Sequence, residues 1–248
     1  MVASAAVRVG MRRLRAVAMW TVLAFVTAEA GLRMAGVHHP PFDRLDEDLG
    51  TALNPGVEGW YTDEGRAYLK VNRDGFLDRE WSRAKPPGTF RIAVLGDQLT
   101  EARQVPRDET FVAVLGRELS ACPALAGRAV EPLNFGVAGY GTGQERIVLQ
   151  RRVWDYAPDA VVVAFNTAND IRANSRRLEP NPMRPFFRYE GDRLALDASF
   201  RDSPTFARHR TWTGRVVDRA LIVSRVFQVA NRLRRTCLLY TSPSPRDS

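Results

Sequence analysis

Between residues 90 and 165 the chain alternates short apolar runs with amphipathic segments, and this pattern constrains the fold more than any other feature. The apolar runs cover residues 90–95, 130–135 and 160–165. Their length and composition fit buried strands, whereas residues 109–120 and 144–156 have helical periodicity. Strands separated by helices form βαβ units. We therefore predict an α/β domain in which helices cover both faces of a parallel sheet.

The charge of the 248-residue chain is concentrated at its two ends. The formal net charge is +8, but residues 1–33 carry +4 and residues 201–248 carry +7, so the body between them is mildly acidic. An acidic body offers no basic surface to a phosphate backbone, and we predict no nucleic-acid partner. The two cysteines, Cys122 and Cys237, lie far apart and support neither a zinc site nor a disulfide framework. We predict no metal and no cofactor.

The N-terminus has the pattern of a targeting segment. Arginines between residues 8 and 15 precede an apolar run over 16–28, which Glu29 and Arg33 interrupt. The run fits a secretory signal peptide with a small-x-small cleavage site at 28–30. An uncleaved transmembrane anchor in the inner membrane over residues 16–36 and a buried amphipathic helix are the alternatives. In the first two cases the arginines stay in the cytoplasm, and the body is exported to a periplasmic or other extracytoplasmic location.

The C-terminal part contains a helical segment followed by an unusual tail. Residues 212–233 place apolar side chains and arginines at helical spacing, and we expect the helix to end near residue 235. It fits a helix packed on the sheet with its arginines in solvent, or alternatively a membrane-surface helix. Residues 237–248 resemble translated sequencing-adapter sequence. We therefore predict that this tail is not native and that the chain is a fragment of a longer protein; a disordered Ser/Pro-rich tail is the alternative.

Two further segments flank the predicted sheet in the sequence. Turn signals punctuate residues 40–89, and strands at 59–62 and 67–71 fit between them, which predicts a small β-rich lead-in. Residues 175–210 combine several prolines with aromatic residues, and we expect them to cap the functional site. His209 falls in an arginine-rich stretch that is typical of a solvated loop.

Polar and glycine-rich blocks follow each of the predicted strands. They read GDQLTE at 96–101, NFGVAGYGT at 134–142 and NTAND at 166–170. Because ligands of open parallel sheets bind beyond the carboxyl ends of the strands, these blocks predict the functional site. A dinucleotide fingerprint is excluded, since its third glycine position is Gln144. Taken singly, the blocks also fit plain turn glycines and a helix N-cap.

Taken together and in this order, the blocks resemble those of the SGNH (GDSL-type) hydrolases, over about residues 45–235. The flanking sequences KPPGTFRI at 85–92 and QVP at 104–106 agree with the resemblance. The predicted domains are the signal or anchor at 1–36, the lead-in at 40–89 and a partial SGNH-like domain at 90–235. For this last domain the resemblance implies a flavodoxin-like, three-layer SGNH hydrolase fold, incomplete at its C-terminus. By the family pattern, Gly139 and Asn169 supply oxyanion-hole donors and Asp97 shapes the turn after the first strand.

The sequence departs from that pattern at the nucleophile. Gln98 stands at the position of the catalytic serine, and a carboxamide cannot form the usual acyl-enzyme. Thr100 is a weak candidate to replace it. The Asp-x-x-His block of the family is absent, and the histidines of the chain are His38, His39 and His209.

Two functions remain open from the sequence. The first is an SGNH-type hydrolase of acyl or acetyl esters, exported or anchored through its N-terminal segment, whose given chain is inactive as an enzyme. The second is a non-catalytic SGNH-like domain that binds an acylated glycan or lipid. Both imply an ester-bearing small molecule, glycan or lipid as the partner.

Overall fold

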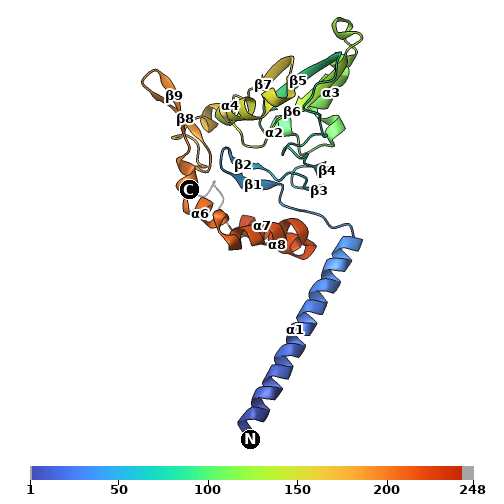
Figure 1. Cartoon of the computed structure of the whole chain (residues 1–248), viewed down its shortest axis with the longest axis vertical. Coiled ribbons are helices and arrows are strands. Elements are labelled where there is room, and N and C mark those ends of the chain that lie inside the picture. The colour runs from blue at the N-terminus through green and yellow to red at the C-terminus, as the bar shows by residue number, and fades with distance from the viewer. Residues whose placement is uncertain (1, 242–248) are drawn as a thin grey trace. The chain divides into compact units, whose positions relative to one another are not determined.

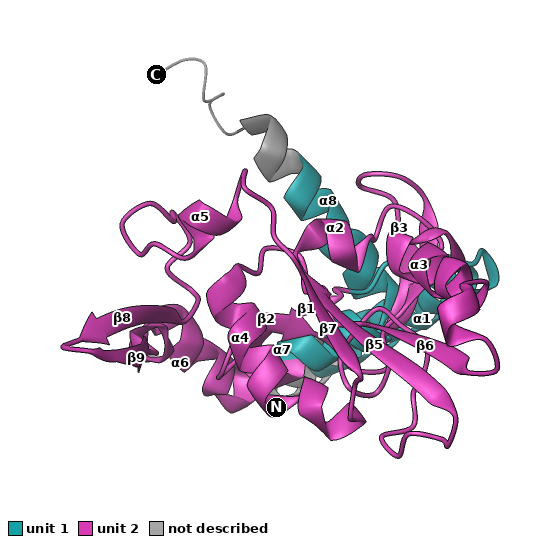
Figure 2. Ribbon diagram, turned by 90° about the horizontal axis from the view of Figure 1, so that it is seen from above, with its two compact units in different colours: residues 1–40, 217–248 teal, residues 41–216 magenta. Residues whose placement is uncertain are grey.

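The computed structural model describes the backbone of residues 2–241 and the side chains of residues 11–236. The chain divides into two compact units (Figure 2). The first comprises residues 1–40 and 217–248, and the second comprises residues 41–216. Each unit is described by itself.

The second unit contains a three-stranded parallel sheet in the order β6-β5-β7 (Figure 1). Its strands are β5 (Thr89–Gly96), β6 (Ala129–Asn134) and β7 (Ala160–Ala164). In the register of the sheet, Val94 of β5 pairs with Asn134 of β6 and with Val162 of β7. All three carboxyl ends therefore reach the same edge. The predicted α/β class with a parallel sheet is confirmed.

Helix α3 (Phe111–Ser120) covers part of this sheet. It begins at Thr110, whose hydroxyl oxygen accepts from the backbone N–H of Ala113, which satisfies one of the open donors of the first turn. A Cβ on Gly116 would lie 2.4 Å from Pro132 Cγ, so the helix approaches β6 more closely than any larger residue allows. Together, α3 and the strands bury a cluster of apolar side chains from Ile92, Val94 and Val112.

The central strand carries one buried charge. Arg91 is fully buried and donates to the carboxylate of Glu131 on β6, with distances of 2.8 Å from Nε and 2.6 Å from Nη2. It also donates to the backbone carbonyl of Tyr156. A buried guanidinium is tolerated only when it is paired and hydrogen-bonded in this way. The pair fixes β5 against β6 at the amino end of the sheet.

The lead-in consists of two antiparallel hairpins. The hairpin of β3 (Glu58–Tyr61) and β4 (Ala67–Lys70) confirms the predicted strands to within one residue. The hairpin of β1 (Asp43–Asp46) and β2 (Gly50–Leu53) was not predicted from the sequence. Both hairpins belong to the same compact unit as the parallel sheet.

Several sequence-based expectations need correction in this unit. The predicted helix over 144–156 divides into α4 (Thr142–Arg151) and a 3-10 turn (Val153–Tyr156). We also expected helices to cover both faces of the sheet, which is wrong at β7. Val162 and Val163 point to opposite faces, and they are 38% and 45% exposed in the described part of the chain. An apolar run predicts a strand but not whether anything packs on it.

Residues 175–210 contain regular structure rather than loops alone. They form the hairpin of β8 (Phe186–Glu190) and β9 (Arg193–Asp197), followed by a 3-10 turn (Ser199–Asp202) and α6 (Pro204–Arg210). His209 therefore lies in a short helix and not in the solvated loop that its arginine-rich neighbourhood predicted. Ser203 caps this helix by accepting from the backbone N–H of Phe206. The remaining short elements of the unit are α2 (Gln98–Glu101), 3-10 turns at Arg107–Glu109 and Pro123–Leu125, and α5 (Asp170–Ala173).

The first unit is helical. Helix α1 (Val2–Met34) is continuous, and its part Met11–Met34 contains an 18-residue window with a mean hydropathy of 1.3, which by length and composition is enough to cross a membrane. The single helix expected over 212–233 is broken at Ser224 into α7 (Trp212–Val223), which runs from the other unit into this one, and α8 (Arg225–Thr241). Helix α8 continues past residue 235, where we expected it to end. Residues 242–248 of the predicted tail lie outside the described residues.

Candidate functional site

The site begins at Asp97, which directly follows β5. Asp97 is 1% exposed, and its Oδ1 accepts from the backbone N–H of Leu99 at 2.9 Å. This hydrogen bond caps the short helix α2 and turns the chain sharply at the end of the strand. Asp97 is thus the N-cap of α2, directly after β5.

Asp97 also joins two strand ends. Its second oxygen, Oδ2, accepts from Asn169 Nδ2 at 2.8 Å and from Asn166 Nδ2 at 3.0 Å, and both asparagines belong to the block that follows β7. A buried carboxylate that accepts several hydrogen bonds is a rigid anchor, because losing any donor leaves its charge undersolvated. Asn166 is a site residue whose role the sequence reasoning missed.

Gln98 lies beside Asn169 at the start of α2. Asn169 Nδ2 lies 3.3 Å from Gln98 Oε1, so the side-chain carbonyl of Gln98 accepts from the side-chain amide of Asn169. Gln98 is half-buried and Asn169 Oδ1 is buried without a partner among the described residues. The two carboxamides thus meet at the carboxyl edge of the sheet, and neither is a nucleophile.

Thr100 is too deeply buried to act as a nucleophile on a molecule that arrives from solvent. Its side chain is fully buried and its hydroxyl lies against Gly96, where a Cβ would come within 2.1 Å of the Thr100 oxygen. The Thr100 hydroxyl has no partner among the described residues. A substrate arriving from solvent cannot reach it.

The loop after β6 carries Gly139 and is bound to α2. Asn134 donates from Nδ2 to the carbonyl of Thr100 and accepts at Oδ1 from the backbone N–H of Gly136. Two residues further along this loop, the backbone N–H of Ala138 donates to Glu101 Oε2 at 3.0 Å. Gly139 follows, exposed and with a φ of +79°, a conformation that favours glycine.

Glu101 is the buried centre of this connection. Its carboxylate is paired with Arg103 at 2.7 Å, and Arg103 reaches Asp43 of β1 at 2.6 Å. One charged network therefore joins the lead-in, α2 and the Gly139 loop. The lead-in is part of the support of the site rather than an independent appendage.

Arg184 holds the other side of the Gly139 loop. This buried guanidinium donates to the backbone carbonyl of Gly139 and, at 3.3 Å, to that of Ala173. Glu179 lies 3.6 Å away and balances part of its charge. Burial lowers the pKa of Arg184, as expected for a cation removed from water. Nothing near residue 184 in the sequence indicated this role.

A second carboxyl group is buried beneath the site. Glu145, in the first turns of α4, is 2% exposed, and neither of its carboxyl oxygens has a partner among the described residues. Burial, together with the nearby carboxylates of Asp170 and Asp97, raises the pKa of Glu145 to about 7. Burial also raises the pKa of Asp170, whose Oδ2 accepts from the backbone of Asn166. The carboxylates of Glu145, Asp170 and Asp97 thus lie close enough to repel one another, and a raised pKa lets one of them keep its proton.

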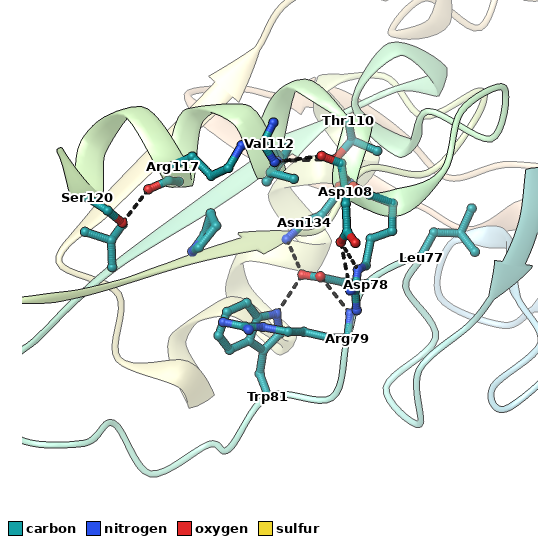
Figure 3. Close-up of a pocket in the computed structure, with 15 residues that line it drawn as sticks. Leu77, Asp78, Arg79, Trp81, Asp108, Thr110, Val112, Arg117, Ser120 and Asn134 are labelled. Atoms are coloured by element: carbon teal, nitrogen blue, oxygen red, sulfur yellow. Dashed lines mark hydrogen bonds and ion pairs between the residues drawn. The ribbon is translucent and has the colours of Figure 1, made fainter.

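A cavity of about 350 Å³, lined by Leu69, Glu101 and Ala102 among others, lies beside α2, and two further cavities border the site region. One of about 300 Å³ lies among the first turn of α4, the end of α5 and the β8–β9 hairpin, and its apolar wall includes Phe186, Phe187 and Leu194. The other, of about 240 Å³, lies between the lead-in and α3 (Figure 3). There Asp78 accepts from the backbone N–H of Asn134 and from Trp81 Nε1. Burial raises the pKa of Asp78.

The part of the chain that the structure describes contains no cluster of His, Cys, Asp and Glu side chains suited to hold a metal ion. His38 and His39 directly follow α1 in the first unit, and His209 lies in α6. The structure thus brings Asp97, Gln98 and Asn169 into direct contact and ties the Gly139 loop to the same short helix.

The comparisons with known proteins do not identify the chain: its sequence matches no protein-family model and no curated protein. The class that the structure defines is therefore an α/β protein with a three-stranded parallel sheet and a polar site at the carboxyl edge of its strands.

Proposed function

We propose that the chain is an SGNH-like domain of the ester-hydrolase type whose site, as given, does not turn over esters. The proposal is supported by the hydrogen bond from Asn169 to Gln98, which joins the two positions that the family pattern assigns to the oxyanion donor and the nucleophile. The order of the three polar blocks along a parallel sheet agrees with that pattern. The Gly139 loop, bound to α2 through Glu101, supports it further.

The absence of turnover follows from chemistry. Acyl transfer needs a nucleophile with a base in hydrogen-bond reach. The Gln98 carboxamide is not such a nucleophile, and the Thr100 hydroxyl is buried. Oxyanion donors alone stabilise a transition state that this site has no group to form.

The test is an assay of the purified 248-residue chain in detergent with a chromogenic acetyl ester. We expect the rate to equal that of buffer alone, and we expect Gln98→Ser to remain at that rate because a hydroxyl without a base is not activated. Turnover by the unaltered chain that Asn169→Ala abolishes would overturn the proposal. A Gln98→Ser variant that becomes active would show instead that a base lies within reach.

A non-catalytic binding function is the second candidate. It is favoured by the cavity of about 300 Å³ beside the first turn of α4, which pairs an apolar wall with the guanidinium of Arg146, 5.5 Å from the ring of Phe187. Such a cavity suits the acyl part of an acylated glycan or lipid. Saturable binding of a fluorescent acylated oligosaccharide, lost in Phe187→Asp and retained in Tyr189→Asp on the exposed part of the same hairpin, would support it.

We further propose that α1 inserts in a membrane and that the body is exported. The apolar run over 16–28, which lies within the candidate span 11–34, and the arginines before residue 16 support this orientation. In a cell fractionation experiment, the chain should sediment with membranes and resist extraction by carbonate. Protease added to the extracytoplasmic side should then degrade the body.

A further inference from the structure

Helix α1 binds both helix ends at the break between α7 and α8. The carboxylate of Glu29 accepts from the backbone N–H groups of Arg225 and Val226, each at 3.1 Å, and from Ser224 Oγ at 2.9 Å. Glu29 therefore caps the positive end of α8, where a carboxylate is most favourable. Glu29 is therefore the residue through which α1 binds the start of α8, and its charge is paired rather than isolated in an apolar helix.

Arg33, one turn further along α1, completes the arrangement. It pairs with Glu29 at 2.7 Å and donates from Nη2 to the carbonyl of Val223, the last residue of α7, at 2.8 Å. A cation at a helix C-terminus complements the dipole there. One turn earlier on the same face of α1, the ring of Phe25 lies 5.8 Å from that of Phe227. Phe25 and Glu29 thus attach α8 to α1, and Arg33 attaches the end of α7 to the same helix.

These contacts bear on whether the N-terminal segment is removed. Cleavage after residue 30 would separate Glu29 and Phe25 from α8 and expose the first N–H groups of that helix. Because Glu29 satisfies those donors, removing it costs stability. The contacts therefore favour an anchor that stays attached to the chain.

The position of these contacts along α1 also determines where α8 lies relative to the membrane surface. Glu29 directly follows the apolar run over 16–28, so the insertion proposed above would place it where the spanning helix leaves the lipid. Beyond the break, α8 exposes Phe227 (45%) and Leu233 (62%), and the last residue of α7, Val223, is also exposed. Arg232, Arg234 and Arg235 lie among these apolar positions. Exposed apolar side chains beside arginines are the pattern of a helix that lies in the surface of an anionic bilayer.

We propose that α1 is a retained anchor that seats α8 on the outer surface of the membrane, with Phe227 and Leu233 in contact with lipid. The inference rests on the insertion of α1 proposed above. It goes beyond that insertion by assigning a second lipid-binding element and the residue, Glu29, that holds it in place.

The test uses the full chain in vesicles of phosphatidylcholine and phosphatidylglycerol. Cys122 and Cys237 are replaced by serine, and a fluorophore is attached to Leu233→Cys or, as a matched control two residues away on α8, to Arg235→Cys. We expect brominated lipids to quench position 233 at least about twofold more than position 235. Glu29→Ala, which removes the cap, should abolish this difference.

The outcomes separate the two proposals. If the chain does not float with the vesicles, the insertion of α1 is wrong. If it floats but positions 233 and 235 are quenched equally, α8 does not lie on lipid and only the present inference fails. If the difference in quenching persists in Glu29→Ala, Glu29 is not the residue that holds α8 against the membrane.

Discussion

Asn169 donates its side-chain amide to Asp97 across two strand ends, with 2.8 Å between Asn169 Nδ2 and Asp97 Oδ2. The same carboxylate caps α2 through the backbone of Leu99. A single 1%-exposed side chain thus fixes both the turn after β5 and the loop after β7. The geometry of the candidate site depends on Asp97 more than on any residue that faces solvent.

Replacing Asp97 by alanine should therefore destabilise the chain. The change leaves the donors of Leu99, Asn166 and Asn169 without their acceptor, and we expect a loss of about 3 kcal/mol in the free energy of unfolding. Urea unfolding of the detergent-solubilised chain, followed by tryptophan fluorescence, measures it. Asp192→Ala, an exposed position on the β8–β9 hairpin, is the matched control and should change stability by less than about 0.5 kcal/mol. Equal losses in both variants would contradict the role given to Asp97.

The sequence predicted the strands of the sheet and the edge at which the site lies. Short apolar runs that end in polar blocks are a local signal, and parallel pairing then brings their carboxyl ends together. That signal located the polar blocks that contain Asp97, Gln98 and Asn169, whereas the roles of these residues were implied by the resemblance and stay predictions. Their mutual hydrogen bonds could not be predicted, because they depend on side-chain orientation across the sheet.

The residues that were missed act through long-range contacts. Arg184 reaches Gly139 across 45 positions of the chain, and Glu29 caps a helix that begins 196 positions later. In the sequence, Glu145 stands in a polar first turn and gives no sign of its burial. The break at Ser224 has neither proline nor glycine to indicate it, because Glu29 and Arg33 supply the caps from another helix.

The raised pKa of Glu145 predicts that the stability of the fold depends on pH. Its pKa in the folded state is about 7, above the value of about 4.5 of an unperturbed glutamate. The folded state therefore holds this proton more tightly, and its contribution to stability is present in full below pH 4.5 and lost as the pH rises through 7. The loss is on the order of 1 to 3 kcal/mol.

The prediction is checked by substituting glutamine, which keeps the size of Glu145 and removes its titration. Between pH 5 and pH 7.5 the unaltered chain should lose more thermal stability than Glu145→Gln. Glu118→Gln, at an exposed position of α3, should behave like the unaltered chain. Identical pH profiles for Glu145→Gln and the unaltered chain would show that Glu145 titrates normally.

The buried pair of Arg91 and Glu131 allows a further prediction. Glu131→Gln leaves the fully buried guanidinium without its counter-charge, and we expect a loss of about 3 kcal/mol in the free energy of unfolding. The double variant Arg91→Met with Glu131→Leu removes both charges and should recover most of that loss. Urea unfolding of the single and double variants measures the coupling. A double variant less stable than Glu131→Gln would show that the hydrogen bonds of Arg91 to backbone carbonyls outweigh the pair.

Gly136 should tolerate no side chain. A Cβ at this position would lie 2.5 Å from the backbone nitrogen of Glu101 and 2.6 Å from Thr100 Cβ, so the loop that leads to Gly139 would have to move away from α2. We expect Gly136→Ala to cost at least about 3 kcal/mol. Gly127→Ala is the control, because nothing lies within 4 Å of its added carbon. The φ of +79° at Gly127 means that Gly127→Ala should still cost about 1 kcal/mol.

Hydrogen exchange measures whether the loop moves. Exchange at residues 136–142 should rise in Gly136→Ala and stay unchanged in Gly127→Ala. Unchanged exchange in both variants would show that close packing on α2 does not hold this loop in place.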